Sequence, residues 1–293
     1  MIKMDYIVID TTDKHLKILL VYGGREYSHC ERAELTHSET LLPALDNLLK
    51  QAECRMPDLQ AAGAVTGPGS FTGIRIGIAT LKGFSAAIRS LKLLAVNSAL
   101  LKSYASLREA FDAEIAAGEF LSVDELKPVY LCNPQAAGDF QLKTEAVTPG
   151  DVPQIAALEK RYFTNPETSG MILSRITNPS ARVACIRDGG LICAYMIARA
   201  AAGVCELETI AVRRAYRRLG FSAFLMRDLL DFAKEMNCSE IRLEARSDNV
   251  SAIALYEKFG FVKTGVRKGY YADGGDCINY KLQTPKRGWR DKG

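Results

Sequence analysis

The sequence predicts an α/β protein of two domains, and three observations support this prediction. The chain has 293 residues, which is enough to bury two hydrophobic cores. In each half, short runs rich in β-branched residues alternate with segments whose apolar residues recur at the helical period. Hydrophobic residues make up 48% of the chain and charged residues 25%, as in a globular protein. No apolar run approaches the roughly 20 residues that a membrane-spanning helix needs.

The N-terminal half predicts a sheet that begins with an antiparallel meander and continues with alternating helices and strands. We expect strands at 4–10, 16–22 and 25–32, a helix at 38–52, a strand at 61–66, and helices at 72–88 and 97–117. Residues 118–143 read as a connector, because Pro128, Pro134 and Gly138 oppose a long regular element.

The C-terminal half predicts a second sheet. The Asp188-Gly189-Gly190 turn joins two strands into a hairpin, and Gly260 ends the last helix. We expect helices at 152–161, from Phe221 onward, and at 250–259; and strands at 181–187, 191–198, 206–212, 240–245, 262–267 and 277–282.

Cysteines and terminal residues indicate the compartment. The eight cysteines form no C-x-x-C pair, which favours isolated thiols in a reducing compartment and no metal site. The first residues lack the apolar core of a signal peptide, so we expect a cytoplasmic protein. Net charge is +4, and the basic tail 285–293 reads as a solubilising end; whether the protein touches tRNA directly stays open.

The segment from Arg217 to Ala223 is the first candidate site. A strand that enters a turn at a helix N-terminus can bind an anionic group, most often phosphate. Arg217 and Arg218 would add positive charge there, and Gly220 would let a ligand approach the backbone. Taken alone, two arginines ahead of a helix are more often a solvated surface.

This segment and the sequence after it resemble the GNAT N-acetyltransferases, a family with a mixed β-sheet. RRLGFSA is similar to the family's pyrophosphate loop, Arg/Gln-x-x-Gly-x-Gly/Ala. The stretches LEARSDN, ALYEKFGF and GYYADG resemble the RimI branch, and the likeness spans about 144–282. The resemblance implies a domain at 144–284 that uses acetyl-CoA.

The resemblance also implies which residues bind the cofactor. Two adjacent strands would separate so that the pantetheine arm lies between them. Ser222 departs from the family pattern, because it replaces the second glycine of the loop; serine is small and keeps its amide. The implied cofactor-binding residues are Ile210, Val212, Arg217, Arg218, Gly220, Ser222, Ala223 and Asn249.

The implied catalytic groups are a carboxylate and a phenol. No histidine can act in this half, because His15, His29 and His37 all lie in the other. Glu244 would then serve as the base, and Tyr256 would protonate the departing thiolate. Plainer readings make Glu244 an arginine-paired surface residue, Tyr256 a core residue, and Asn249 a helix cap. Tyr270 and Tyr271 match the pair that contacts the peptide substrate.

The N-terminal half resembles TsaB, a partner protein in threonylcarbamoyl-adenosine synthesis on tRNA. GPGSFTGIRIG and IVIDTT carry the likeness over about 1–105. The resemblance implies an actin/Hsp70-like (ribonuclease H-like) fold at 1–117, with only one of the usual two lobes. We therefore expect a protein-binding module without nucleotide chemistry, whose helices 38–52 and 72–88 could bind a TsaD-like partner.

Together these patterns favour a RimI-type Nα-acetyltransferase that acts on the N-terminal amine of a small-subunit ribosomal protein. Two alternatives stay open. In the first, the protein is a scaffold for the tRNA modification, and acetyl transfer is secondary. In the second, the acceptor is a small amine or a lysine.

Overall fold

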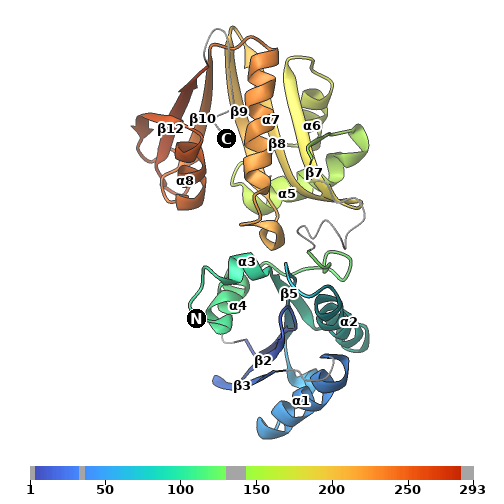
Figure 1. Cartoon of the computed structure of the whole chain (residues 1–293). Helices are drawn as coiled ribbons and strands as arrows, with labels where there is room; N and C mark the ends of the chain where they lie inside the picture. The colour runs from blue at the N-terminus through green and yellow to red at the C-terminus, as the bar shows by residue number, and fades with distance from the viewer. Residues whose placement is uncertain (1–3, 33–36, 130–142, 285–293) are drawn as a thin grey trace. The chain divides into compact units, whose positions relative to one another are not determined.

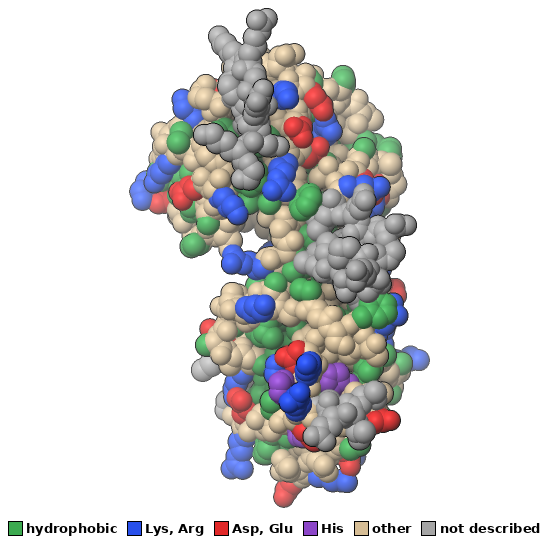
Figure 2. All heavy atoms as spheres, viewed as in Figure 1, with side chains coloured by type: hydrophobic (Ala, Val, Ile, Leu, Met, Phe, Trp, Pro, Cys, Tyr) green, Lys and Arg blue, Asp and Glu red, His purple; other side chains and the backbone are tan. Residues whose placement is uncertain are grey.

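The computed structural model describes residues 4–32, 37–129 and 143–284 (Figure 1). Residues 130–142 of the predicted connector, which include Cys132, and the basic tail therefore lie outside the described residues. The chain forms two compact units, one of Met1–Phe140 with Arg214–Leu219, the other of Gln141–Arg213 with Gly220–Gly293. On the face shown in Figure 2, acidic and basic side chains are interspersed over both units.

Unit 1 is built on a five-stranded sheet of order β3-β2-β1-β4-β5. The antiparallel meander was predicted, and β4 and β5 extend it with parallel pairing. The strands are β1 (Tyr6–Asp10), β2 (His15–Tyr22), β3 (Arg25–Arg32), β4 (Ala61–Val65) and β5 (Lys92–Val96). The helices are α1 (His37–Gln51), η1 (Met56–Asp58), α2 (Phe71–Ala87), α3 (Ser98–Leu101) and α4 (Leu107–Ala116).

Helices cover both faces of this sheet, because successive side chains of a strand point to opposite faces. Ile7 and Ile9 of β1 pack with the apolar faces of α1 and α2. Tyr6 and Val8 of the same strand pack in a second cluster with Phe111 of α4. This double burial explains why all five residues of β1 are buried.

Two details of unit 1 differ from the sequence prediction. Strand β5 was missed, although it is buried in four of its five positions. The predicted helix over 97–117 is two helices, because side chains start a helix at two points. Asn97 accepts a hydrogen bond from the backbone N–H of Leu100, and Ser106 accepts one from that of Glu109.

Unit 2 is built on a seven-stranded sheet of order β11-β12-β10-β9-β8-β7-β6. Strands β9 and β10 run parallel, and the other described neighbours run antiparallel. The strands are β6 (Glu145–Ala146), β7 (Ala181–Asp188), β8 (Leu191–Ala201), β9 (Val204–Val212), β10 (Glu240–Arg246), β11 (Val262–Arg267) and β12 (Cys277–Gln283).

Helix α7 lies across β7, β8 and β9 (Figure 1). A separate core joins α5 and α6 to β7 and β8. The prediction missed α6, a helix of only 8 residues in which Ile172 is the one buried residue. The helices are η2 (Pro149–Asp151), α5 (Val152–Tyr162), α6 (Ser169–Ile176), α7 (Phe221–Glu235) and α8 (Val250–Lys258); η3 (Arg214–Tyr216) falls in unit 1.

Two glycines of the GPGSFTG loop, Gly69 and Gly73, are explained by close packing against the residues that follow β1. A Cβ on Gly69 would lie 2.3 Å from the carbonyl oxygen of Thr12, and one on Gly73 would lie 2.0 Å from that of Thr11. The hydroxyl of Thr11 donates a hydrogen bond to the carbonyl of Gly73 at 2.7 Å. The loop is therefore locked onto the β1–β2 turn by its own backbone.

This packing gives a stability prediction with an internal control. Gly73→Ala should destabilise the protein by about 1–3 kcal/mol, because the new methyl group meets a fixed backbone oxygen. Gly83 lies in the same helix, and a Cβ there meets nothing within 4 Å. Gly83→Ala should instead stabilise by about 0.5–1 kcal/mol. Urea unfolding of both variants checks this, and equal midpoints would contradict the packing account.

Candidate active site

Strands β9 and β10 separate along their length. They pair from Val204 with Glu240 to Leu207 with Leu243, and the pairing ends there. Beyond that point β9 continues to pair with β8, and β10 continues to pair with β12. The resemblance to the GNAT family implies such a separation, and the strand register confirms it. Ile210 and Val212 lie in the stretch of β9 that β10 does not pair.

A bulge in β9 marks the point of separation. The register between β8 and β9 shifts between Ile197 and Ala198, which leaves Glu208 as the extra residue between Leu207 and Thr209. A bulge bends its strand and interrupts the ladder. Glu208 therefore sits where β9 turns away from β10.

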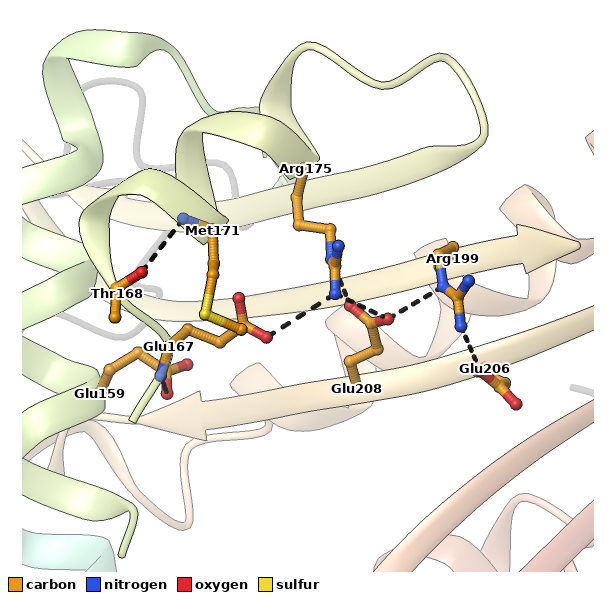
Figure 3. A network of polar contacts seen from close by, with 8 residues as sticks. All are labelled: Glu159, Glu167, Thr168, Met171, Arg175, Arg199, Glu206 and Glu208. Atoms are coloured by element: carbon orange, nitrogen blue, oxygen red, sulfur yellow. Dashed lines mark hydrogen bonds and ion pairs between the residues drawn. The ribbon is translucent and has the colours of Figure 1, made fainter. Parts of the chain in front are cut away.

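The bulge is held by charged side chains that the sequence analysis did not identify (Figure 3). Glu208 accepts hydrogen bonds from Arg175 of α6 at 2.7 and 3.2 Å, and from Arg199 of β8 at 3.1 Å. Arg199 also binds Glu206, at 2.9 Å. Arg175 lies on α6, the helix that was not predicted. It is 33 residues from Glu208 in the sequence, and no motif links the two residues.

The same network reaches a buried carboxylate. Glu159 of α5 is 1% exposed, and it accepts hydrogen bonds from the Tyr195 hydroxyl at 2.6 Å and from the backbone N–H of Glu167 at 3.0 Å. Burial raises the pKa of Glu167, and Arg175, 3.9 Å away, opposes the rise. These contacts tie α5 and α6 to the bulged strand.

The loop after β9 has unusual backbone geometry. Arg218 has φ +63° and Gly220 has φ +83°, both in the left-handed region. A Cβ on Gly220 would meet nothing within 4 Å, so its backbone conformation explains the glycine in this structure. Arg217 and Arg218 belong to the segment that groups with unit 1.

Helix α7 starts directly after this loop. Gly220 is its N-cap, and Ser222 and Ala223 lie half-exposed in its first turn. The first N–H groups of a helix have no partner within the helix and carry partial positive charge. A helix N-terminus beside arginines suits the pyrophosphate of a nucleotide-type cofactor.

Glu244 lies on the exposed face of β10, as the alternation predicted, and its side chain is 48% exposed. It forms an ion pair with Arg267 of β11, and the thiol of Cys277 lies 3.7 Å from its carboxylate. The plainer reading of Glu244, an arginine-paired surface carboxylate, thus describes its contacts in this structure.

The tyrosine pair lies between β11 and β12. The rings of Tyr270 and Tyr271 form a T-shaped contact at 5.2 Å. The guanidinium of Arg267 lies 3.9 Å from the ring centre of Tyr270, and that of Arg246 lies 4.6 Å from the ring centre of Tyr271. Through Arg267, these tyrosines and Glu244 belong to one cluster.

Tyr256 and Asn249 lie apart from that cluster in their contacts. Tyr256 is 4% exposed and packs against the rings of Phe261 and Tyr280. Burial raises its pKa to about 12, so the phenol keeps its proton at neutral pH. The side chain of Asn249 accepts a hydrogen bond from the backbone N–H of Ala252 at 3.2 Å and so caps α8.

Family models match the two halves of the chain separately. The model described as the acetyltransferase (GNAT) family matches residues 152–261. The model described as tRNA N6-adenosine threonylcarbamoyltransferase (TsaD) matches residues 21–111. Members of the GNAT family use acetyl-CoA, which is therefore the cofactor of this domain.

Known proteins resemble most of the chain and each of its parts. An uncharacterized protein of Mycobacterium leprae is 27% identical over 82% of this chain and 87% of its own length. The N-alpha-acetyltransferase RimI of Mycobacterium tuberculosis is 33% identical over 43% of this chain and 82% of its own. The solved YeaZ structure from Pseudomonas aeruginosa is 32% identical, with a TM-score of 0.31, over 32% of this chain and 44% of its own.

The regions matched by the two family models do not overlap, and they follow one another in the order that the sequence motifs indicated. The chain therefore joins a TsaB/TsaD-like N-terminal region to a C-terminal acetyltransferase domain of the GNAT family.

Proposed function

We propose that the protein transfers an acetyl group from acetyl-CoA to the N-terminal amine of a small-subunit ribosomal protein. The observation that carries the proposal is the separation of β9 and β10 after Leu207 and Leu243, next to the loop that starts α7. The names of two relatives support the acceptor. One is the RimI protein above; the other, from Bacillus subtilis, is named a putative ribosomal protein bS18-alanine N-acetyltransferase and is 29% identical.

The described residues fit the cofactor. Acetyl-CoA supplies an activated acetyl thioester. The pyrophosphate would be held by Arg217, Arg218 and the first N–H groups of α7. Gly220, Ser222 and Ala223 have small side chains, which would let the pyrophosphate approach the backbone of that turn. The backbone of β9 at Ile210 and Val212 would align the pantetheine arm, and Asn249 would bond it from the start of α8.

Two side chains would move protons. The Glu244 carboxylate, solvent-accessible on β10, would accept the proton of the incoming amine directly or through water. The Tyr256 phenol would donate a proton to the departing thiolate. Tyr270 and Tyr271, next to Glu244 in the cluster described above, would contact the peptide. The expected place of the reaction is the cytoplasm.

The role of Glu244 is testable on the same strand. Glu244→Gln should lower kcat by roughly 100-fold, the lower end of what a general base contributes, with the acetyl-CoA Kd within about twofold of wild type. The matched control is Glu240→Gln, which removes another arginine-paired carboxylate of β10. Thiol release and calorimetry measure the two quantities. Similar activity in both variants would remove Glu244 from the base role.

Tyr256 gives a second prediction. Tyr256→Phe keeps the ring packing, so cofactor affinity should persist while kcat falls about tenfold or more. Because the pKa of this phenol is raised to about 12, its deprotonation should not lower wild-type kcat between pH 8 and 10. Tyr280→Phe, in the same aromatic cluster, should retain activity. Full turnover by Tyr256→Phe would return this residue to a packing role.

A second function is favoured by the N-terminal region. Its match to the TsaD model, and exposed apolar side chains on the suspected helices, support binding of a TsaD-like partner. Leu42 of α1 is 55% exposed and Phe71 of α2 is 39% exposed. In this role the region would recruit the tRNA-modifying machinery without performing its chemistry.

This second function predicts a separable defect. Leu42→Asp should abolish co-purification with a TsaD-like protein and leave acetyl-CoA turnover unchanged, because Leu42 belongs to unit 1 and the acetyltransferase sheet belongs to unit 2. Val123→Asp is the control, since Val123 is 42% exposed in the same unit but lies on neither helix. Retained binding by Leu42→Asp, or equal loss in both variants, would contradict a docking surface on α1.

A further inference from the structure

Asn97 uses its whole side chain in unit 1. It is fully buried after β5. Its amide oxygen accepts a hydrogen bond from the backbone N–H of Leu100 at 2.8 Å. Its amide nitrogen donates to the carbonyls of Ala215 at 3.0 Å and Arg217 at 2.9 Å. A side-chain amide has two N–H donors, and here both donate to one short segment of backbone.

Glu114 holds the same segment. This residue of α4 is 1% exposed, and its carboxylate oxygens lie 2.7 and 2.6 Å from Nε of Arg214. Arg214 also donates to the carbonyl of Ala113 at 3.4 Å. A buried carboxylate needs such a partner, because an unpaired charge is costly to remove from water.

The segment held in this way is Arg214–Leu219, which groups with unit 1. It contains Arg217 and Arg218 and ends one residue before Gly220. The clamped carbonyl of Arg217 directly precedes Arg218, whose φ of +63° is a conformation that non-glycine residues adopt at a cost. Asn97 binds the carbonyls of Ala215 and Arg217, on either side of Tyr216, and these contacts fix the backbone that leads into Arg218.

We propose that Asn97 and Glu114 are positioning residues for acetyl-CoA. They hold the backbone from Arg214 to Arg217, so that Arg217 and Arg218 are preorganised to bind the cofactor's pyrophosphate. Cofactor affinity then depends on two side chains of the N-terminal region, far from the loop in sequence. The inference rests on the proposed function only in assigning the pyrophosphate to this loop.

The most specific test is Asn97→Asp. An aspartate has the same size and still caps α3, but it replaces the two N–H donors with an oxygen facing two carbonyls. Glu114→Gln removes the charge that pairs with Arg214. Controls are the same exchanges at exposed positions, Asn47→Asp in α1 and Glu109→Gln in α4. Asn97→Ser, which also caps and adds no charge, serves if Asn97→Asp does not fold.

The readout compares two ligands of the full-length protein by calorimetry, acetyl-CoA and S-acetyl-pantetheine, which lacks the pyrophosphate. Asn97→Asp and Glu114→Gln should each weaken acetyl-CoA binding about tenfold or more, because the first loses two hydrogen bonds and the second a buried ion pair. S-acetyl-pantetheine affinity should stay within about twofold, and both controls should bind as wild type.

Three results would be decisive against the inference. Unchanged acetyl-CoA affinity in Asn97→Asp, Asn97→Ser and Glu114→Gln would show that the clamp does not serve the cofactor. Equal weakening of both ligands would show a general loss of structure. Equal weakening in the controls would show an effect of charge alone. If the wild type itself fails to bind acetyl-CoA, the proposed function fails first, and this outcome is distinct from the others.

Discussion

The acetyltransferase half depends on the bulge at Glu208, because this residue decides where β9 leaves β10. Two parallel strands that paired to their ends would leave no room for a cofactor arm between them. Here the ladder stops after Leu207, and arginines from α6 and β8 hold the Glu208 carboxylate at that point. The carboxylate is 16% exposed, so its ion pairs are less screened than surface pairs.

Most of the fold could be predicted from the sequence, and the failures have physical causes. Long helices and the β hairpins were found from their apolar periods and their turn residues. Strand β5 and helix α6 were missed, and both are short: β5 has 5 residues and α6 has 8. The break between α3 and α4 depends on side-chain caps at Asn97 and Ser106, which a helical period does not reveal.

The sequence motifs named candidate site residues but not their partners. They singled out Glu244, Tyr256 and the loop before α7, whose roles stay predictions. They could not show that Arg267 pairs with Glu244, or that Asn97 and Glu114 hold Arg214–Arg217, because these contacts join residues up to 120 positions apart. In the glycine-rich loop of unit 1, backbone packing accounts for Gly69 and Gly73, and the sequence did not reveal this packing either.

The most direct test of the central claim is to incubate the full-length protein with acetyl-CoA and the N-terminal peptide of a bS18-type ribosomal protein, and to locate the product by mass spectrometry. A matched peptide with a blocked α-amine and an added lysine serves as control. We expect acetylation at the α-amine of the first peptide and none on the second. Acetylated lysine in the control, or acetyl-CoA binding without any peptide product, would contradict an Nα-acetyltransferase acting on this substrate.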